Sequence, residues 1–237
     1  MKNNSTLRKF DLPKLSLSVI FVFAFLFLHF VDAQTKPEFL VTWQAQNYVP
    51  DWYQGKILPI SGTPVNISFE LIDNGEIADL SKITIRWYVN DKLVINENNG
   101  LGIKNLKINI PDSNGMQTEI RIVVLDYLES MIDKLVYIPV VGPEAVINAP
   151  YADEKIKTGS SIFELSPFFF NINNLSNLSV SWLMNGQKPT TADNPYVFNL
   201  NVGSETPSGT KINISASIKN ILKEFESASQ NLNLVIK

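Results

Sequence analysis

The chain offers few side chains that could carry out covalent chemistry. It has 237 residues, no cysteine and one histidine, His29, which lies in an apolar N-terminal run. Cys-His and Ser-His-Asp systems and the usual zinc and iron ligand sets therefore cannot be built after that run. The visible carboxylates are Asp112, in a turn-like PDSNG sequence, and the adjacent pair Asp153 and Glu154. Adjacent residues on a strand point apart, whereas a glycosidase needs two carboxylates that converge. We expect no enzyme, no cofactor and no metal site.

One unusual stretch, residues 41–59 with the sequence VTWQAQNYVPDWYQGKILP, concentrates aromatic residues. It contains Trp43, Tyr48, Trp52 and Tyr53, and the second half of the chain has no equivalent. Aromatic rings next to Gln, Asn and Asp can stack on sugars or anchor a protein partner. Aromatic residues dominate cores as well, so the simpler expectation is a first strand plus a loop that packs on its own domain.

The elements that would position these residues are short strands. In ITIRWYVNDKLV, residues 83–94, apolar and polar residues alternate around Trp87, which indicates a half-buried strand ended by a turn. The same pattern returns in LSVSWLMNGQKP, residues 178–189, around Trp182, and the Asn-Gly that follows is a strong hairpin signal. Strict alternation predicts that both tryptophans are buried. No segment has a long helical period, so the chain is predicted to be all-β.

The order of strands in the first half repeats in the second. VNISFELI, NLKINI, EIRIVVLD and KLVYIPV in the first half correspond to IFEL with FFFNI, YVFNLNV, KINISASI and NLNLVI in the second. A repeat of this length fits two sandwich domains, 37–141 and 143–237, joined at Gly142-Pro143. So short a linker favours a semi-rigid tandem.

A tryptophan on the third strand, followed by Asn-Asp or Asn-Gly and several more strands, resembles the immunoglobulin-like, PKD-like and fibronectin-III-like domains of bacterial exported or surface proteins. The resemblance implies two tandem immunoglobulin-like β-sandwiches with Trp87 and Trp182 between the sheets. The chain departs from it in having no cysteine pair, and the Asp-rich turn of PKD domains is missing after Trp87. The resemblance does not specify a function, because sandwiches share architecture without sharing activity.

The N-terminus, residues 1–33, resembles a targeting segment. A cationic stretch precedes an apolar run, Leu15–Val31, and VDAQ offers a cleavage site before Gln34. The alternative is an uncleaved membrane anchor, since the run is close to spanning length. Either interpretation predicts an extracytoplasmic protein, secreted or at the cell surface, that meets the membrane only through this segment. The net charge of −3, without a basic run beyond the N-terminus, argues against nucleic acid as a partner.

The two domains are predicted to differ on one outer sheet face, formed by the third, sixth and seventh strands. In the second domain the outward residues are mostly Ser and Asn. In the first domain they are Arg86, Tyr88, Arg121, Val123, Leu125, Leu135 and Tyr137. So large an apolar surface should be covered, either by segment 43–58 of the same domain or by a partner.

These patterns favour a non-catalytic extracytoplasmic protein that acts in protein–protein interaction or in surface or envelope assembly, including assembly of a pilus. The partner is unknown. The alternative is a carbohydrate-binding module that uses residues 43–53. The candidate interaction surface comprises Trp43, Tyr48, Trp52, Tyr53, Tyr88, Val123, Leu125, Leu135 and Tyr137.

Overall fold

The computed structural model describes residues 36–112, 117–149, 151, 153–189 and 194–237, and in these residues the chain is built of β-strands. The predicted signal peptide or anchor, 1–33, lies outside the described residues. No helix in the described part is both long and apolar enough to cross a membrane. The helical elements there are two 3₁₀ turns, η2 (Glu97–Asn99) and η3 (Leu175–Asn177).

The first domain consists of two packed sheets. One has the order β1-β2-β3, with β6 also paired to β2, and the other has the order β5-β4-β7-β8. The bounds are β1 (Glu38–Ala45), β2 (Pro64–Asp73), β3 (Glu76–Ile77), β4 (Ile85–Val89), β5 (Lys92–Ile95), β6 (Asn105–Asn109), β7 (Gln117–Tyr127) and β8 (Ser130–Pro139).

The second domain repeats this arrangement with sheets β13-β11-β9 and β10-β15-β14-β12. Its short strand β10 runs parallel to β15, whereas the other pairs are antiparallel. The bounds are β9 (Glu144–Asn148), β10 (Lys155–Ile156), β11 (Gly159–Phe168), β12 (Leu178–Met184), β13 (Val197–Val202), β14 (Lys211–Asn220) and β15 (Ser227–Ile236).

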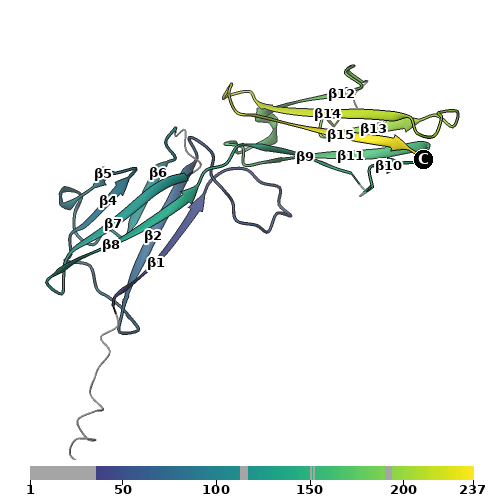
Figure 1. The fold of residues 1–237 in the computed structure, drawn as a ribbon. Coiled ribbons are helices and arrows are strands. Elements are labelled where there is room, and N and C mark those ends of the chain that lie inside the picture. Colours follow the sequence, from purple (N-terminus) through teal and green to yellow (C-terminus); the bar gives the residue numbers. More distant parts are fainter. Residues whose placement is uncertain (1–35, 113–116, 150, 152, 190–193) are drawn as a thin grey trace, which may run out of the picture.

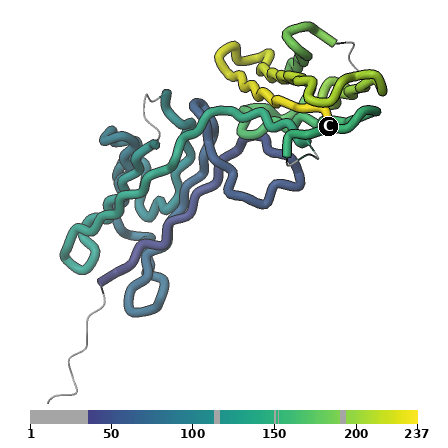
Figure 2. The backbone as a smooth tube through the Cα atoms, turned by 45° about the vertical axis from the view of Figure 1, so that its right-hand side comes forward, coloured from purple at the N-terminus to yellow at the C-terminus, as the bar shows by residue number. Residues whose placement is uncertain are grey.

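The chain is therefore a tandem of two immunoglobulin-like sandwiches, as the sequence predicts. In each, the strand that bears the tryptophan lies in the same sheet as the last two long strands. All strands of the first domain precede Gly142, and all strands of the second follow it. The two sandwiches lie end to end, and the strands of one are inclined to those of the other (Figures 1 and 2).

Both tryptophans are core residues, which confirms the prediction from alternation. Trp87 and Trp182 are 0% and 1% exposed. Each indole N–H donates to a main-chain carbonyl, at 2.8 Å to Ile103 and at 2.9 Å to Pro195. A buried tryptophan needs such an acceptor, so each ring both fills its core and holds the connection that crosses the sandwich.

Candidate interaction surface

The outer face of the β5-β4-β7-β8 sheet carries the seven outward residues predicted for the first domain. Strand register sets Leu93, Tyr88, Arg121 and Leu135 opposite one another, so they form a row across all four strands. Ile138, which alternates with Tyr137 on β8, is buried in the core, as the outward assignment of Leu135 and Tyr137 requires. The face is therefore an amphipathic row of two aliphatic side chains, one aromatic ring and one guanidinium.

Two arginines are held in place on this face. The Arg121 guanidinium lies 4.3 Å from the centre of the Tyr88 ring, and it meets Asp91 at 3.8 Å. Arg86 donates two hydrogen bonds of 3.1 Å to the Glu97 carboxylate. These bonds raise the pKa of Arg86 and lower that of Glu97. A cation stacked on an aromatic ring and a bidentate ion pair both reduce the rotamer freedom that binding would otherwise remove.

The apolar residues of the face differ in how much they show to solvent. Leu135 and Tyr137 are 40% and 48% exposed, while Tyr88 and Leu125 are half-buried. Val123 is 5% exposed although it points outward, because it lies between Arg86 and Asp133 on the neighbouring strands. The exposed apolar area thus lies on the two edge strands, at Leu93 on β5, which is 45% exposed, and at Leu135 and Tyr137 on β8.

The matching face of the second domain is polar. Ser179 and Ser181 on β12 and Asn231 and Asn233 on β15 are exposed there. The Asn233 side chain accepts a hydrogen bond of 2.9 Å from the Asn213 amide. Its apolar members are Leu183, which is 41% exposed, and the half-buried Val235, so most of this face is polar, in contrast to the first domain.

Trp43, the first residue of the aromatic segment, packs on its own domain. It lies on β1 against the first core, and the Lys56 ammonium sits 4.0 Å above its ring and donates to its carbonyl at 2.6 Å. For Trp43 the expectation of packing on its own domain is confirmed.

Tyr48 packs on the other domain, so for this residue the expectation is wrong. Its main-chain N–H donates to the Phe170 carbonyl, and its carbonyl accepts from the Phe169 N–H, both at 2.7 Å. The ring packs against the core of the second domain. Burial, and then the charge of Asp51, raise the pKa of the Tyr48 phenol above its ordinary value of 10.0.

Tyr53 also belongs to the domain junction. Its ring meets Phe168 and Phe169 edge-on at 5.5 and 6.0 Å, and with Ile60 these phenylalanines form a separate apolar cluster. Trp52 touches Phe168 edge-on at 5.6 Å but remains 65% exposed. The described contacts of residues 43–58 therefore place the segment at the junction, and the idea that it covers the first-domain face is wrong.

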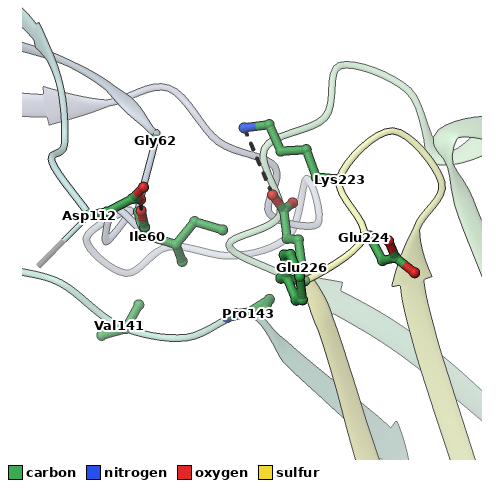
Figure 3. Close-up of a pocket in the computed structure, with 10 residues that line it drawn as sticks. Ile60, Gly62, Asp112, Val141, Pro143, Lys223, Glu224 and Glu226 are labelled. Carbon is green, nitrogen blue, oxygen red and sulfur yellow. Dashed lines mark hydrogen bonds and ion pairs between the residues drawn. The ribbon is translucent and has the colours of Figure 1, made fainter. Parts of the chain in front are cut away.

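Hydrogen bonds between polar groups also join the two domains at this junction. The Asn171 side chain accepts a 2.6 Å hydrogen bond from the Thr63 hydroxyl and donates at 3.0 Å to the Ser61 carbonyl. The buried Glu226 carboxylate accepts from the Asn171 main chain at 2.6 Å and from Asn220 at 3.0 Å. Beside it lies a cavity of about 370 Å³ between residues 60–62 and the β14–β15 turn, in which Lys223 faces Glu226 (Figure 3).

The carboxylates weighed as catalytic candidates are engaged locally. Asp112 accepts a hydrogen bond from the Ser61 hydroxyl. A main-chain hydrogen bond from Lys155 and the charge of Lys237 lower the pKa of Asp153. Among the described residues, no group of three or more His, Cys, Asp or Glu side chains could hold a metal ion.

Sequence reasoning missed the partners of the aromatic segment, Phe168 to Asn171. The available signal was FFFNI, an apolar run that continues past the end of a strand pattern. Phe169 has φ of 62°, a left-handed backbone that a bulky residue adopts only when its surroundings hold it. The two main-chain hydrogen bonds of Tyr48, with Phe169 and Phe170, hold Phe169 in this conformation.

Comparison with known proteins shows similarity only at the level of fold. No protein-family model matches the chain, and no curated protein matches it either. Among solved structures, the N-terminal Ig1-2 module of the Drosophila receptor protein tyrosine phosphatase DLAR is 11% identical, with a TM-score of 0.27, over 86% of this chain and 100% of that one.

Two further structures are similar to the same extent. The three N-terminal domains of the bacteriophage RB49 Hoc protein are 10% identical, with a TM-score of 0.33, over 85% of this chain and 70% of that one. The Bacteroides ovatus protein SGBP-B, in complex with a mixed-linkage heptasaccharide, is 14% identical, with a TM-score of 0.26, over 86% of this chain and 47% of that one. Scores of this size do not bear on function.

Proposed function

We propose that the protein is a non-catalytic extracytoplasmic module that binds a partner protein, in surface or envelope assembly, through the β5-β4-β7-β8 face of its first domain. The observation that supports this is the row Leu93, Tyr88, Arg121 and Leu135, extended by Tyr137. Tyr and Arg are enriched among the residues that dominate binding energy, particularly where packing has already fixed their rotamers.

The packing of residues 43–53 argues against the carbohydrate alternative. Sugar stacking on residues 43–53 needs rings that are exposed together, but Tyr48 and Tyr53 are packed into the junction and Trp43 lies under Lys56. Of the four residues, only Trp52 is exposed, at 65%. The segment therefore has a structural role that explains three of its four aromatic residues.

A binding comparison tests the proposal. Leu135→Glu with Tyr137→Glu places two charges on exposed positions of β8, which should abolish retention of partner proteins from an envelope extract while the fold persists. The matched control, Ser217→Glu with Asn233→Glu, makes the same change on the polar face of the second domain. The proposal is wrong if both variants retain the same proteins as the wild type. Retention of soluble glycans that is lost in Trp52→Ala would instead support the carbohydrate alternative.

A further inference from the structure

The seam between the two sheets is closed in the second domain. There β9 approaches β15, and the Gln230 side-chain carbonyl accepts a hydrogen bond from the main-chain N–H of Ile147. Farther along the same edge, β10 adds to the end of β15 as a short parallel strand. Main chain of the same domain thus covers the last strand on its open side.

The corresponding seam of the first domain is open. A groove of about 710 Å³ lies between residues 36–39, at the start of β1, and residues 130–134, at the start of β8. Over the described residues, β8 forms a ladder with β7 and with no strand on its other side. Beyond the end of β8, the Val141 N–H donates to the Pro59 carbonyl at 3.0 Å.

Lys134 occupies the position that closes the seam in the second domain. Trp87 on β4 pairs with Ile122 on β7, and Ile122 pairs in turn with Lys134 on β8. In the second domain, Trp182 on β12 pairs with Ala216 on β14, and Ala216 pairs with Gln230 on β15. Gln230 binds the main chain of β9, whereas Lys134 is exposed and makes no ion pair within the described residues. Glu38 and Asp133 line the same groove, but within the described residues neither forms an ion pair with Lys134, so the ammonium group remains available to an acceptor brought by another chain.

The walls of the groove are suited to an extended chain. Phe39 and Ile132 line the groove, and Val136 lies farther along the same side of β8; all three are half-buried against the first core and form an apolar strip along the seam. Charged residues, Lys36, Glu38 and Asp133, make up much of the remaining lining. An unpaired strand edge is a template for a further strand. Lys134 points to the same side as Ile132 and Val136, and an inward charge of this kind opposes indiscriminate pairing. A strand with an acidic residue at that position would be accepted selectively.

We propose that this seam receives an extended segment of a partner protein, added as a strand to β8, with apolar side chains at alternate positions and a carboxylate that reaches Lys134. Main-chain hydrogen bonds would supply affinity, and the apolar strip and Lys134 would supply register. The seam lies at the edge of the sandwich, whereas the face with Tyr88 and Leu135 lies on the sheet, so either surface can bind without the other.

Peptide selection tests the seam directly. A random dodecapeptide phage library is selected on the wild-type chain, and the enriched peptides are synthesised. They should show apolar residues at every second position together with Asp or Glu. Lys134→Glu should weaken their binding by about tenfold or more, and Lys134→Arg should retain it, because the charge is reversed in one and kept in the other.

Site-specific blocking supplies the control. The chain has no cysteine, so Lys134→Cys can carry one bulky maleimide in the seam, and Lys92→Cys one on β5, at the opposite edge of the same sheet. The first should abolish peptide binding, and the second should leave it unchanged. Peptides that bind both labelled proteins equally, or a selection that enriches nothing, would overturn the proposal. Two other results would also overturn the proposal. If the wild-type chain is a dimer that the label at position 134 dissociates, the occupant of the seam is a second copy of the chain. If the Lys134 amine resists labelling until residues 1–35 are removed, the occupant is the chain's own N-terminus.

Discussion

Single residues in equivalent places perform the same task with different partners in the two domains. Trp87 and Trp182 each fill a core and donate to a main-chain carbonyl. Trp182→Ala should destabilise the protein by about 3–5 kcal/mol, because it removes a large buried ring and leaves the Pro195 carbonyl without its donor. Urea unfolding measures the loss. Leu183→Ala, at the next and exposed position, should change stability by less than about 1 kcal/mol; equal losses in the two variants would contradict the assigned orientation of β12.

Tyr48 makes the junction sensitive to alkali. Its folded pKa lies above the ordinary value of 10.0 because burial and Asp51 disfavour the phenolate. The stability from this group is therefore complete below pH 10.0 and is lost as the pH rises through the folded pKa. Tyr48→Phe should lessen the loss of stability above pH 10.0, measured by urea unfolding at a series of pH values. Burial also raises the pKa of Tyr196, so some alkaline dependence should remain. Identical profiles for wild type and variant would show that Tyr48 does not contribute.

At the scale of elements, the long connection between β1 and β2 acts as the clamp of the junction. Asn171 links it to the β14–β15 turn through Thr63, Ser61 and Glu226. Asn171→Ala should cost about 1–3 kcal/mol, because the buried Thr63 hydroxyl loses the acceptor of its hydrogen bond and the Ser61 carbonyl loses its donor.

The readout for the clamp is the coupling between domains. In Asn171→Ala, the two domains should unfold in more clearly separated steps than in the wild type, as followed by calorimetry. Asn173→Ala, an exposed neighbour on the same loop, is the matched control and should behave as the wild type. A variant at position 171 that unfolds as the wild type does would mean that the aromatic contacts alone hold the clamp.

At the scale of the whole molecule, the second sandwich borrows part of its packing from the first. Tyr48 lies against its core, and the Tyr53 cluster covers Phe168 and Phe169. Residues 143–237 alone should therefore fold as a sandwich but be about 2–4 kcal/mol less stable than within the full chain, since two aromatic contacts are lost. Equilibrium unfolding of the fragment and the full chain measures this difference. Equal stability would show that the second domain is stable without the first and that the junction contacts do not stabilise it.

Much of the architecture was predictable because it depends on local alternation. Strands such as β2 and β4 place every second residue in the core, and the buried side chains Ile67, Phe69 and Trp87 follow that period. The turns after the tryptophan strands likewise follow from Asn-Asp and Asn-Gly, with positive φ at Asn90 and Asn185. The same alternation predicts which residues point outward. It therefore predicts the polar outer face of the second domain and the more apolar outer face of the first.

The sequence by itself thus determined the tandem sandwich, the buried tryptophans and the composition of the first-domain face, since each depends on neighbours at a fixed spacing. The tertiary structure alone decided where the aromatic segment lies, because Tyr48 and Phe170 are 122 residues apart in the chain and nothing local specifies their pairing. It also decided that the seam beside β8 is open while the one beside β15 is closed. That difference depends on how near one strand comes to another across the sandwich, a distance set by packing between sheets and not by any pattern along the chain.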